Sequence, residues 1–207
     1  MYHQVGLFAR PAHHRANFCH VERFRQHMKW LKRLRCHVIG MDVAAAGLRG
    51  ERPLPPRAIV ITFDDGYENF HEFALPALRE HQFPALVYVV SGLLGKTAAW
   101  LDPTGLPPAP LMSAARIRDL RRAGIQIGSH TVTHPRLDQL STPAARRELA
   151  DSKSALEDVL GEQVNHLCYP YGSHDLEIMR AAAEIGYLTG TTCVRAAARP
   201  GDDLLAL

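Results

Sequence analysis

Short apolar runs rich in β-branched residues recur along the chain and alternate with segments of helical periodicity. Apolar runs of roughly four to eight residues, bounded by turn signals, predict buried strands. The predicted strands span residues 37–41, 58–63, 85–90, 125–130, 166–171 and 188–194, with short additional ones at 1–5 and 204–207.

Amphipathic helices are predicted between these strands, where apolar residues recur at helical spacing. Thr142 and Ser173 stand where helix N-caps belong, and Pro143 suits the first helical turn. The predicted helices span residues 21–34, 69–82, 113–123, 143–160 and 174–185.

The alternation of strands and helices predicts an α/β fold in which helices cover a parallel sheet. Seven or eight strands favour a distorted (β/α) barrel over an open sheet. The 207 residues fit one domain, 1–207, by the usual size of a hydrophobic core. Proline-rich segments at 53–56 and 103–110 are predicted loops.

Polar side chains follow several predicted strands at the point where the apolar run stops. Asp64 and Asp65 follow the strand at 58–63, His130 ends the strand at 125–130, and the segment 169–172 ends another. In parallel α/β folds the chemistry collects at the carboxyl ends of strands, so these groups are expected to lie together.

His130 and His134 are four residues apart in "GSHTVTHP". The β-branched residues between them and Pro135 disfavour a helix, so the pair is predicted on a strand end and the loop that leaves it. Two histidines and one carboxylate form a known catalytic zinc set, in which Asp64 or Asp65 would supply the oxygen. The alternatives are that the aspartates are solvated turn residues before Gly66 and that the histidines are structural.

The composition and the charge distribution argue against nucleic-acid binding and against a membrane-spanning segment. Hydrophobic residues make up 46% and charged residues 22%, with a net charge of +3, which is ordinary for a globular protein. The basic stretch at 29–35 is interpreted as a solvated helix face, and no nucleic-acid partner is predicted. No apolar run is long enough to span a membrane, and no signal peptide opens the chain. The expected location is cytoplasmic as written, or periplasmic or extracellular if the N-terminus has been trimmed.

Three motifs resemble those of the polysaccharide deacetylases, the NodB-homology or carbohydrate esterase family 4 enzymes. They are "TFDDGY" at 62–67, "SHTVTH" at 129–134 and "YPYG" at 169–172. The resemblance implies a distorted barrel of about seven strands that removes N-acetyl groups from amino sugars of a polysaccharide or related bacterial glycan. It also implies one divalent metal ion, with Zn²⁺ as the favoured ion and Co²⁺, Ni²⁺ or Fe²⁺ as alternatives.

The resemblance carries residue roles with it. Asp64 would be the general base, and Asp65, His130 and His134 would bind the metal. The backbone N–H of Tyr171 would hold the oxyanion, and Tyr171 would shape the substrate groove together with its neighbour Pro170.

The sequence departs from the usual family pattern at two places. Cys168 stands where many members have an arginine that contacts the catalytic aspartate, and no histidine follows His174 to serve as the general acid. "MYHQVG" at the start resembles the permuted branch that deacetylates poly-β-1,6-N-acetylglucosamine, so His3 is the predicted acid. Trp100 either packs or stacks on a sugar ring.

Two other functions are compatible with these motifs. One is a catalytically inactive carbohydrate-binding relative, and the other is a deacetylase of a small non-polymeric N-acetyl compound. The sequence makes no prediction of oligomeric state.

Overall fold

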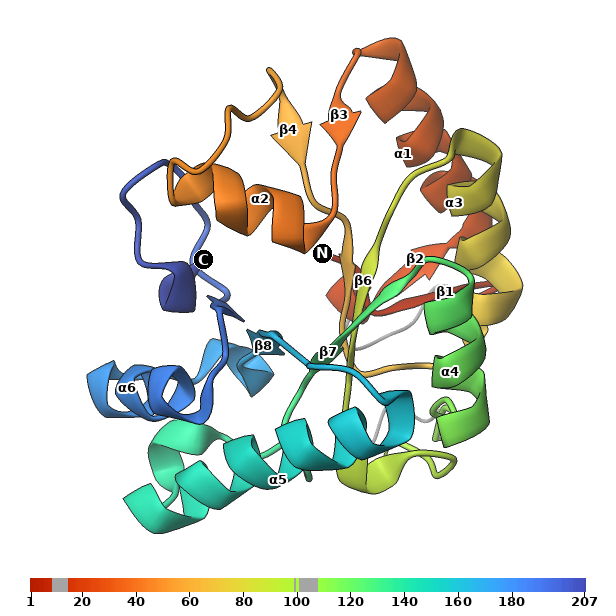
Figure 1. Cartoon of the computed structure of the whole chain (residues 1–207). Coiled ribbons are helices and arrows are strands. Elements are labelled where there is room, and N and C mark those ends of the chain that lie inside the picture. Colours follow the sequence, from red (N-terminus) through yellow and green to blue (C-terminus); the bar gives the residue numbers. More distant parts are fainter. Residues whose placement is uncertain (9–14, 99, 101–107) are drawn as a thin grey trace.

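A parallel five-stranded sheet forms the centre of the molecule in the computed structural model, which describes residues 1–8, 15–98, 100 and 108–207. The sheet curls into part of a barrel, with its helices outside (Figure 1). Its strands, in spatial order, are β5 (Thr62–Phe63), β6 (Leu86–Val89), β7 (Gln126–Ser129), β8 (His166–Cys168) and β9 (Thr189–Thr191).

Two further parallel strand pairs extend the curl among the described residues. They are β1 (Gln4–Gly6) with β2 (Phe18–His20), and β3 (His37–Val38) with β4 (Ala58–Ile59). Tyr2 pairs with Phe63 in a parallel bridge, and its backbone N–H donates to Thr62 O at 2.8 Å. The backbone N–H of Asp64 in turn donates to Tyr2 O at 2.9 Å. This pairing places the residues after Tyr2 beside the carboxyl end of β5.

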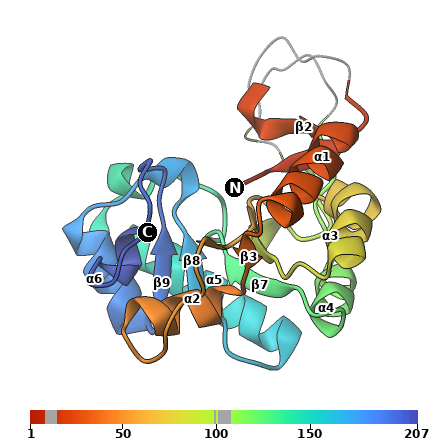
Figure 2. The same cartoon turned by 90° about the horizontal axis from the view of Figure 1, so that it is seen from above.

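Helices pack around the sheet and connect its strands (Figures 1 and 2). A π-helix (Phe70–Ala74) leads directly into α3, and short 3₁₀-helices include Leu137–Gln139 and Pro170–Gly172. The α-helices are α1 (Val21–Arg33), α2 (Met41–Leu48), α3 (Leu75–His81), α4 (Ala114–Arg122), α5 (Thr142–Leu160) and α6 (Leu176–Ile185). Among the described residues, none of these helices is both long enough and apolar enough to cross a membrane.

The core lies on both faces of the sheet, as expected for parallel strands. Every residue of β6 is fully buried, and alternate side chains enter different clusters. Val87 packs in the cluster that includes Phe24 and Met28 of α1, whereas Leu86 packs with Met41 at the start of α2. One face of the sheet therefore packs against α1 and the other against the start of α2.

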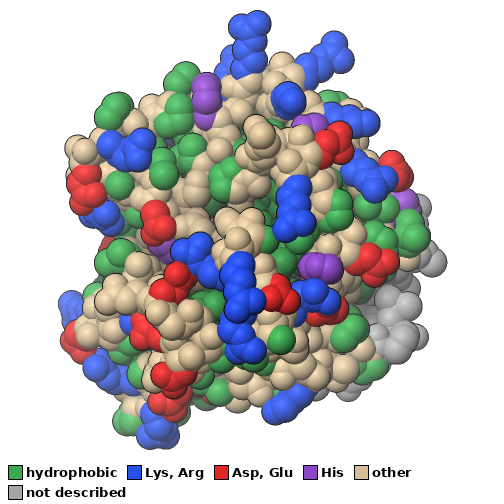
Figure 3. Space-filling view, turned by 45° about the vertical axis from the view of Figure 1, so that its right-hand side comes forward, with side chains coloured by type: hydrophobic (Ala, Val, Ile, Leu, Met, Phe, Trp, Pro, Cys, Tyr) green, Lys and Arg blue, Asp and Glu red, His purple; other side chains and the backbone are tan. Residues whose placement is uncertain are grey.

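The side that carries α1, α3 and α4 is solvated. Lys29, Lys32 and Arg33 are exposed on α1, in agreement with the interpretation of 29–35 as a helix face. Basic and acidic side chains are interspersed over this side (Figure 3).

The predicted α/β fold with a curled parallel sheet is confirmed, and all five predicted helices form with shifted ends. Strand β2 and helix α2 were not predicted, and the predicted strand at 204–207 is wrong. Leu204–Ala206 is a 3₁₀-helix, because Asp203 caps it by accepting the Leu205 N–H at 2.8 Å.

Three predicted strands, those at 37–41, 166–171 and 188–194, are too long, and both predicted caps are wrong. The first is limited to β3 because Met41 already begins α2, and the strand predicted at 58–63 is divided into β4 and β5. β8 stops at Cys168, because Pro170–Gly172 turns into a 3₁₀-helix, and β9 stops at Thr191. Ser141 and Asp175 occupy the N-cap positions instead of Thr142 and Ser173. Thr142 already lies inside the helix, and the Ser173 hydroxyl donates to Asp138 at 2.5 Å.

His166 links α2 to the sheet from the amino end of β8. It is buried, with Nε2 2.9 Å from Asp42 Oδ1 and Nδ1 2.9 Å from Thr189 Oγ1. Burial lowers the pKa of His166 below its usual 6.5, although the Asp42 carboxylate acts in the opposite direction. The unfolded chain therefore binds the proton first when the pH falls, and folding loses stability below about pH 6.5.

We predict that the free energy of unfolding falls less steeply between pH 7.5 and 5.5 for His166→Gln than for the unchanged protein. The pH slopes of the free energy of unfolding differ between the two proteins by at most about 1.4 kcal/mol per pH unit, because one proton is involved. Urea unfolding at both pH values measures it. Equal slopes for the two proteins would contradict this role of His166.

Candidate active site

The carboxyl ends of the central strands surround a cleft of about 490 Å³. Its lining combines acidic, imidazole, thiol and aromatic side chains from the ends of β5, β7, β8 and β9 and from the loops that follow them. The described residues that line it include Met1, His3, Ala16, Asn17, Asp64, Asp65, Trp100, His130, His134, Arg136, Cys168, Tyr169, Tyr171, Thr191, Thr192 and Cys193.

Asp65 lies between two imidazoles at the base of the cleft. Its Oδ1 is 3.4 Å from His130 Nε2 and 3.2 Å from His134 Nε2, and all three side chains are buried. Oδ1 makes no hydrogen bond of ordinary geometry with the described residues. One carboxylate oxygen and two imidazole nitrogens therefore converge within 4.8 Å of one another, which is the donor set of a divalent metal site.

The backbone around these three groups adopts unusual conformations. Asp65, Thr131 and His134 have positive φ angles of 73°, 66° and 65°, a region that side chains disfavour. Such residues persist only when surrounding contacts hold them in place. The observed turns aim the three side chains toward one point, and the histidine pair lies at a strand end and in a loop, as predicted.

Glu148 of α5 holds the loop that carries His134. Its Oε2 accepts the backbone N–H groups of Val132 and Thr133 at 2.8 and 2.9 Å, and its Oε1 accepts the Thr133 hydroxyl at 2.7 Å. Within the loop, Thr131 Oγ1 accepts the His134 N–H at 3.1 Å. A charged acceptor that satisfies three donors fixes this loop strongly.

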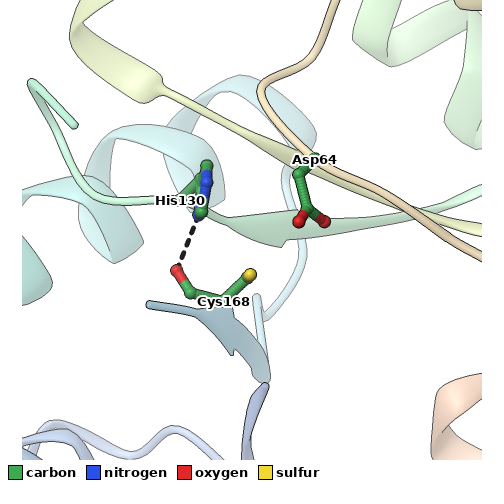
Figure 4. Close-up of side chains that lie close together, drawn as sticks. All are labelled: Asp64, His130 and Cys168. Carbon is green, nitrogen blue, oxygen red and sulfur yellow. Dashed lines mark hydrogen bonds between the residues drawn. The ribbon is translucent and has the colours of Figure 1, made fainter. Parts of the chain in front are cut away.

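Each imidazole is oriented by a second contact. His130 Nδ1 is 2.7 Å from the Cys168 carbonyl, so this nitrogen carries the proton and Nε2 is left to face Asp65 (Figure 4). The His134 ring stacks on Trp100, with ring centroids 4.4 Å apart and an interplanar angle of 17°. The cleft therefore presents both imidazoles in fixed orientations.

Asp64 is buried beside this cluster and faces two different groups. Its Oδ2 lies 3.9 Å from His3 Nε2, and its Oδ1 has no hydrogen-bond partner among the described residues. The Cys168 side chain points toward the Asp64 carboxylate from β8 (Figure 4). The Cys168 thiol, an Asp64 carboxylate oxygen and a His130 ring nitrogen lie within 4.8 Å of one another.

The two adjacent carboxylates have opposite proton affinities. Burial raises the pKa of Asp64. Burial also acts to raise the pKa of Asp65, but the closely facing imidazoles of His130 and His134 outweigh it and lower that pKa. Asp64 is therefore the carboxylate suited to accept a proton, and Asp65 is the one suited to stay ionised.

Tyr171 lies at the rim of the cleft and is 46% exposed. Its φ is +59°, and its ring contacts the His134 ring edge-to-face at 4.7 Å. The Arg136 guanidinium carbon lies 4.5 Å from the centre of the Tyr171 ring. Pro170 is buried and is not among the described lining residues, although it begins the 3₁₀-helix that carries Tyr171.

The structure thus brings together all the predicted site residues except Pro170. Arg136 was not predicted from the sequence. Trp100 was predicted either to pack or to stack on a sugar, and the structure stacks it on His134. Arg136 follows the histidine motif by two positions, and that proximity was the available signal. The contact of Trp100 with His134 had no signal in the sequence, because Trp100 lies in a separate loop.

The family profile of polysaccharide deacetylases matches residues 51–190. The chain is 27% identical to YxkH of Bacillus subtilis over 184 residues, which are 89% of this chain and 62% of that protein. It is 36% identical to the poly-beta-1,6-N-acetyl-D-glucosamine N-deacetylase of Escherichia coli over 62 residues, which are 30% of this chain and 9% of that protein. The chain therefore spans less than two thirds of these relatives.

The fold is similar to that of the Streptococcus pyogenes deacetylase PplD, solved in complex with acetate. The TM-score is 0.86 at 23% identity, and the match covers 100% of this chain and 87% of that one. The family profile covers more than half of the chain and includes both aspartates, both histidines and the "YPYG" segment. The chain belongs to the polysaccharide deacetylase family.

Proposed function

We propose that this protein is a metal-dependent hydrolase that removes N-acetyl groups from amino sugars of a bacterial polysaccharide. The observation that carries the proposal is the pairing of two unlike carboxylates in one cleft. Asp65 converges with two imidazoles, while its neighbour Asp64 lies beside His3 and Cys168. The name of the Escherichia coli relative supports a glycan substrate.

The three-residue cluster fits a divalent ion. Two imidazole nitrogens and one carboxylate oxygen suit Zn²⁺, with Co²⁺, Ni²⁺ or Fe²⁺ as alternatives, and the buried Asp65 carboxylate needs a positive charge beside it. When bound, such an ion supplies Lewis-acid activation of water and of the acetyl carbonyl. The residues that would hold it are Asp65, His130 and His134.

In the proposed reaction Asp64 accepts a proton and His3 donates one. Because burial raises the pKa of Asp64, its carboxylate is a better proton acceptor than an exposed aspartate, and it is placed to take a proton from the attacking water. His3 lines the same cleft, with Nε2 3.9 Å from Asp64 Oδ2, and in this proposal it protonates the departing amine. The Tyr171 N–H stabilises the oxyanion of the tetrahedral intermediate.

Asp64→Asn is expected to lower kcat by about 10²- to 10⁴-fold while the protein keeps its metal, because only the proton acceptor is lost. Asp65→Ala and His134→Ala are expected to lose both activity and metal. Acetate release from β-1,6-linked and β-1,4-linked N-acetylglucosamine oligomers measures activity, and elemental analysis of the purified proteins measures metal.

Asp151→Asn is the matched control for these variants, because Asp151 is exposed on α5 outside the described cleft lining. It should keep full activity and full metal content. Full metal retention in both Asp65→Ala and His134→Ala would overturn the ligand assignment.

His3→Ala is expected to lower kcat by about 10²-fold with metal content unchanged, because the leaving amine loses its proton donor. The acidic limb of the rate profile, which reports the base, should remain. His37→Ala serves as control, since His37 is exposed on β3 and does not line the described cleft. Undiminished turnover in His3→Ala would remove His3 as the acid.

Cys168→Ala is expected to lower kcat by about threefold to tenfold with little change in KM. The thiol beside the Asp64 carboxylate is lost, but the carbonyl that orients His130 remains. Cys168→Ser should recover most of the rate, because a hydroxyl restores a polar donor beside Asp64. Steady-state kinetics at equal metal content tests this, and identical rates for the Ala and Ser variants would show that no hydrogen bond from this position matters.

A further inference from the structure

Arg136 is a cation at the rim of the cleft that the proposed reaction does not use. Its side chain is exposed, and its guanidinium lies over the Tyr171 ring. Among the described residues, no carboxylate forms an ion pair with it, and none of its N–H groups is in a hydrogen bond. The guanidinium is held by a flat aromatic surface, and its donors are left available.

Several other arginines on the surface are neutralised locally. Arg116 donates to Glu68 at 2.6 Å, Arg49 donates to Glu51 at 2.5 Å, and Arg121 pairs with Glu162. These pairs use the guanidinium as a structural cation. Arg136 differs from them because its contact is with a ring, which positions the charge without satisfying its hydrogen-bond donors.

The electrostatics of the cleft favour an anion at this point. Arg136 is the only lysine or arginine among the described lining residues. The two acids, Asp64 and Asp65, are buried at the base, with exposed fractions of 6% and 2%. Asp65 is also offset by His130 and His134. A ligand that enters along the Tyr171 side therefore meets the guanidinium first.

Tyr171 connects this cation to the reacting centre. The Trp100 ring stacks on the His134 ring, and the His134 ring contacts the Tyr171 ring. The Arg136 guanidinium packs on Tyr171 at the end of this row. A single aromatic ring therefore separates the Arg136 guanidinium from the His134 imidazole of the proposed metal site. A planar guanidinium fork matches the two oxygens of a carboxylate or phosphate.

We propose that Arg136 forms an anion subsite, which selects N-acetylated glycans that carry a carboxylate or phosphate on or next to the sugar that loses its acetyl group. This inference rests on the proposed deacetylase function and adds a substrate class to it. The Tyr171 ring positions the Arg136 guanidinium, and the anion of the substrate supplies the hydrogen-bond acceptors for its N–H groups.

The test compares substrates that differ in one charge. The probes are an N-acetylglucosamine tetramer, the tetramer with 3-O-lactyl carboxylates on alternate sugars, the matching lactyl carboxamide and a 6-phosphorylated tetramer. We expect kcat/KM to be about tenfold higher for the carboxylate or the phosphate probe than for its neutral partner, as a hydrogen-bonded ion pair at a partly exposed site would give. The probe that shows the preference identifies the anion.

Arg136→Gln should reduce that preference to about one, mainly by a rise in KM for the charged probe. Arg118→Gln is the matched control, because Arg118 is exposed on α4 and is not among the described lining residues. It should keep the full preference. If Arg136→Gln still prefers the charged probe, the proposal is overturned, because the metal or a histidine would then bind the anion.

Two other results would also overturn it. One is equal kcat/KM for charged and neutral probes in the unchanged protein. The other is an equal loss on charged and neutral probes in Arg136→Gln, which would mean that Arg136 acts only by holding Tyr171.

A binding measurement separates this inference from the function on which it rests. The Asp64→Asn protein, loaded with Zn²⁺, is titrated calorimetrically with the carboxylate probe and with its carboxamide, before and after Arg136→Gln. A dissociation constant about tenfold lower for the carboxylate, lost with Arg136, supports the subsite whether or not acetate is released. Absence of acetate from every probe would overturn the proposed deacetylation alone.

Discussion

The burial of two adjacent carboxylates is the constraint on which the rest of this structure depends. Like charges repel, and a carboxylate without compensation is costly to bury. Asp65 is compensated by two imidazoles that arrive from β7 and the loop after it. Asp64 faces a more distant imidazole, that of His3, and burial raises its pKa. The sheet brings these partners together, because parallel strands end at one edge.

The unequal treatment of the two carboxylates explains how one fold supports both metal binding and base chemistry. An ionised carboxylate next to cationic or metal partners is a stable ligand, whereas a desolvated one accepts protons readily. The chain achieves this difference between consecutive residues by turning the backbone through a positive φ at Asp65. That turn directs the two side chains toward different sets of neighbours.

Patterning and motifs predicted the framework and the base of the cleft. The strands and long helices follow from apolar periodicity, and the aspartate and histidine motifs were visible as polar residues at strand ends. Helix α2 was missed because its eight residues, "MDVAAAGL", are nearly all small or apolar and show no clear polar face. The positions of Arg136 and Trp100 depend on tertiary contacts with Tyr171 and His134, which no local pattern encodes. The nearness of Cys168 to Asp64 agrees with the family resemblance, in which this position contacts the catalytic aspartate.

Glu148 shows how far the chemistry extends beyond the cleft. It lies on α5, does not belong to the described lining, and yet accepts three hydrogen bonds from the loop that presents His134. A helix moves as a rigid element, so any change in the way α5 packs on the sheet is passed to an imidazole at the reacting centre. Substitutions on the buried face of α5, far from any sugar, are therefore a route by which the geometry of the metal site can be tuned during evolution.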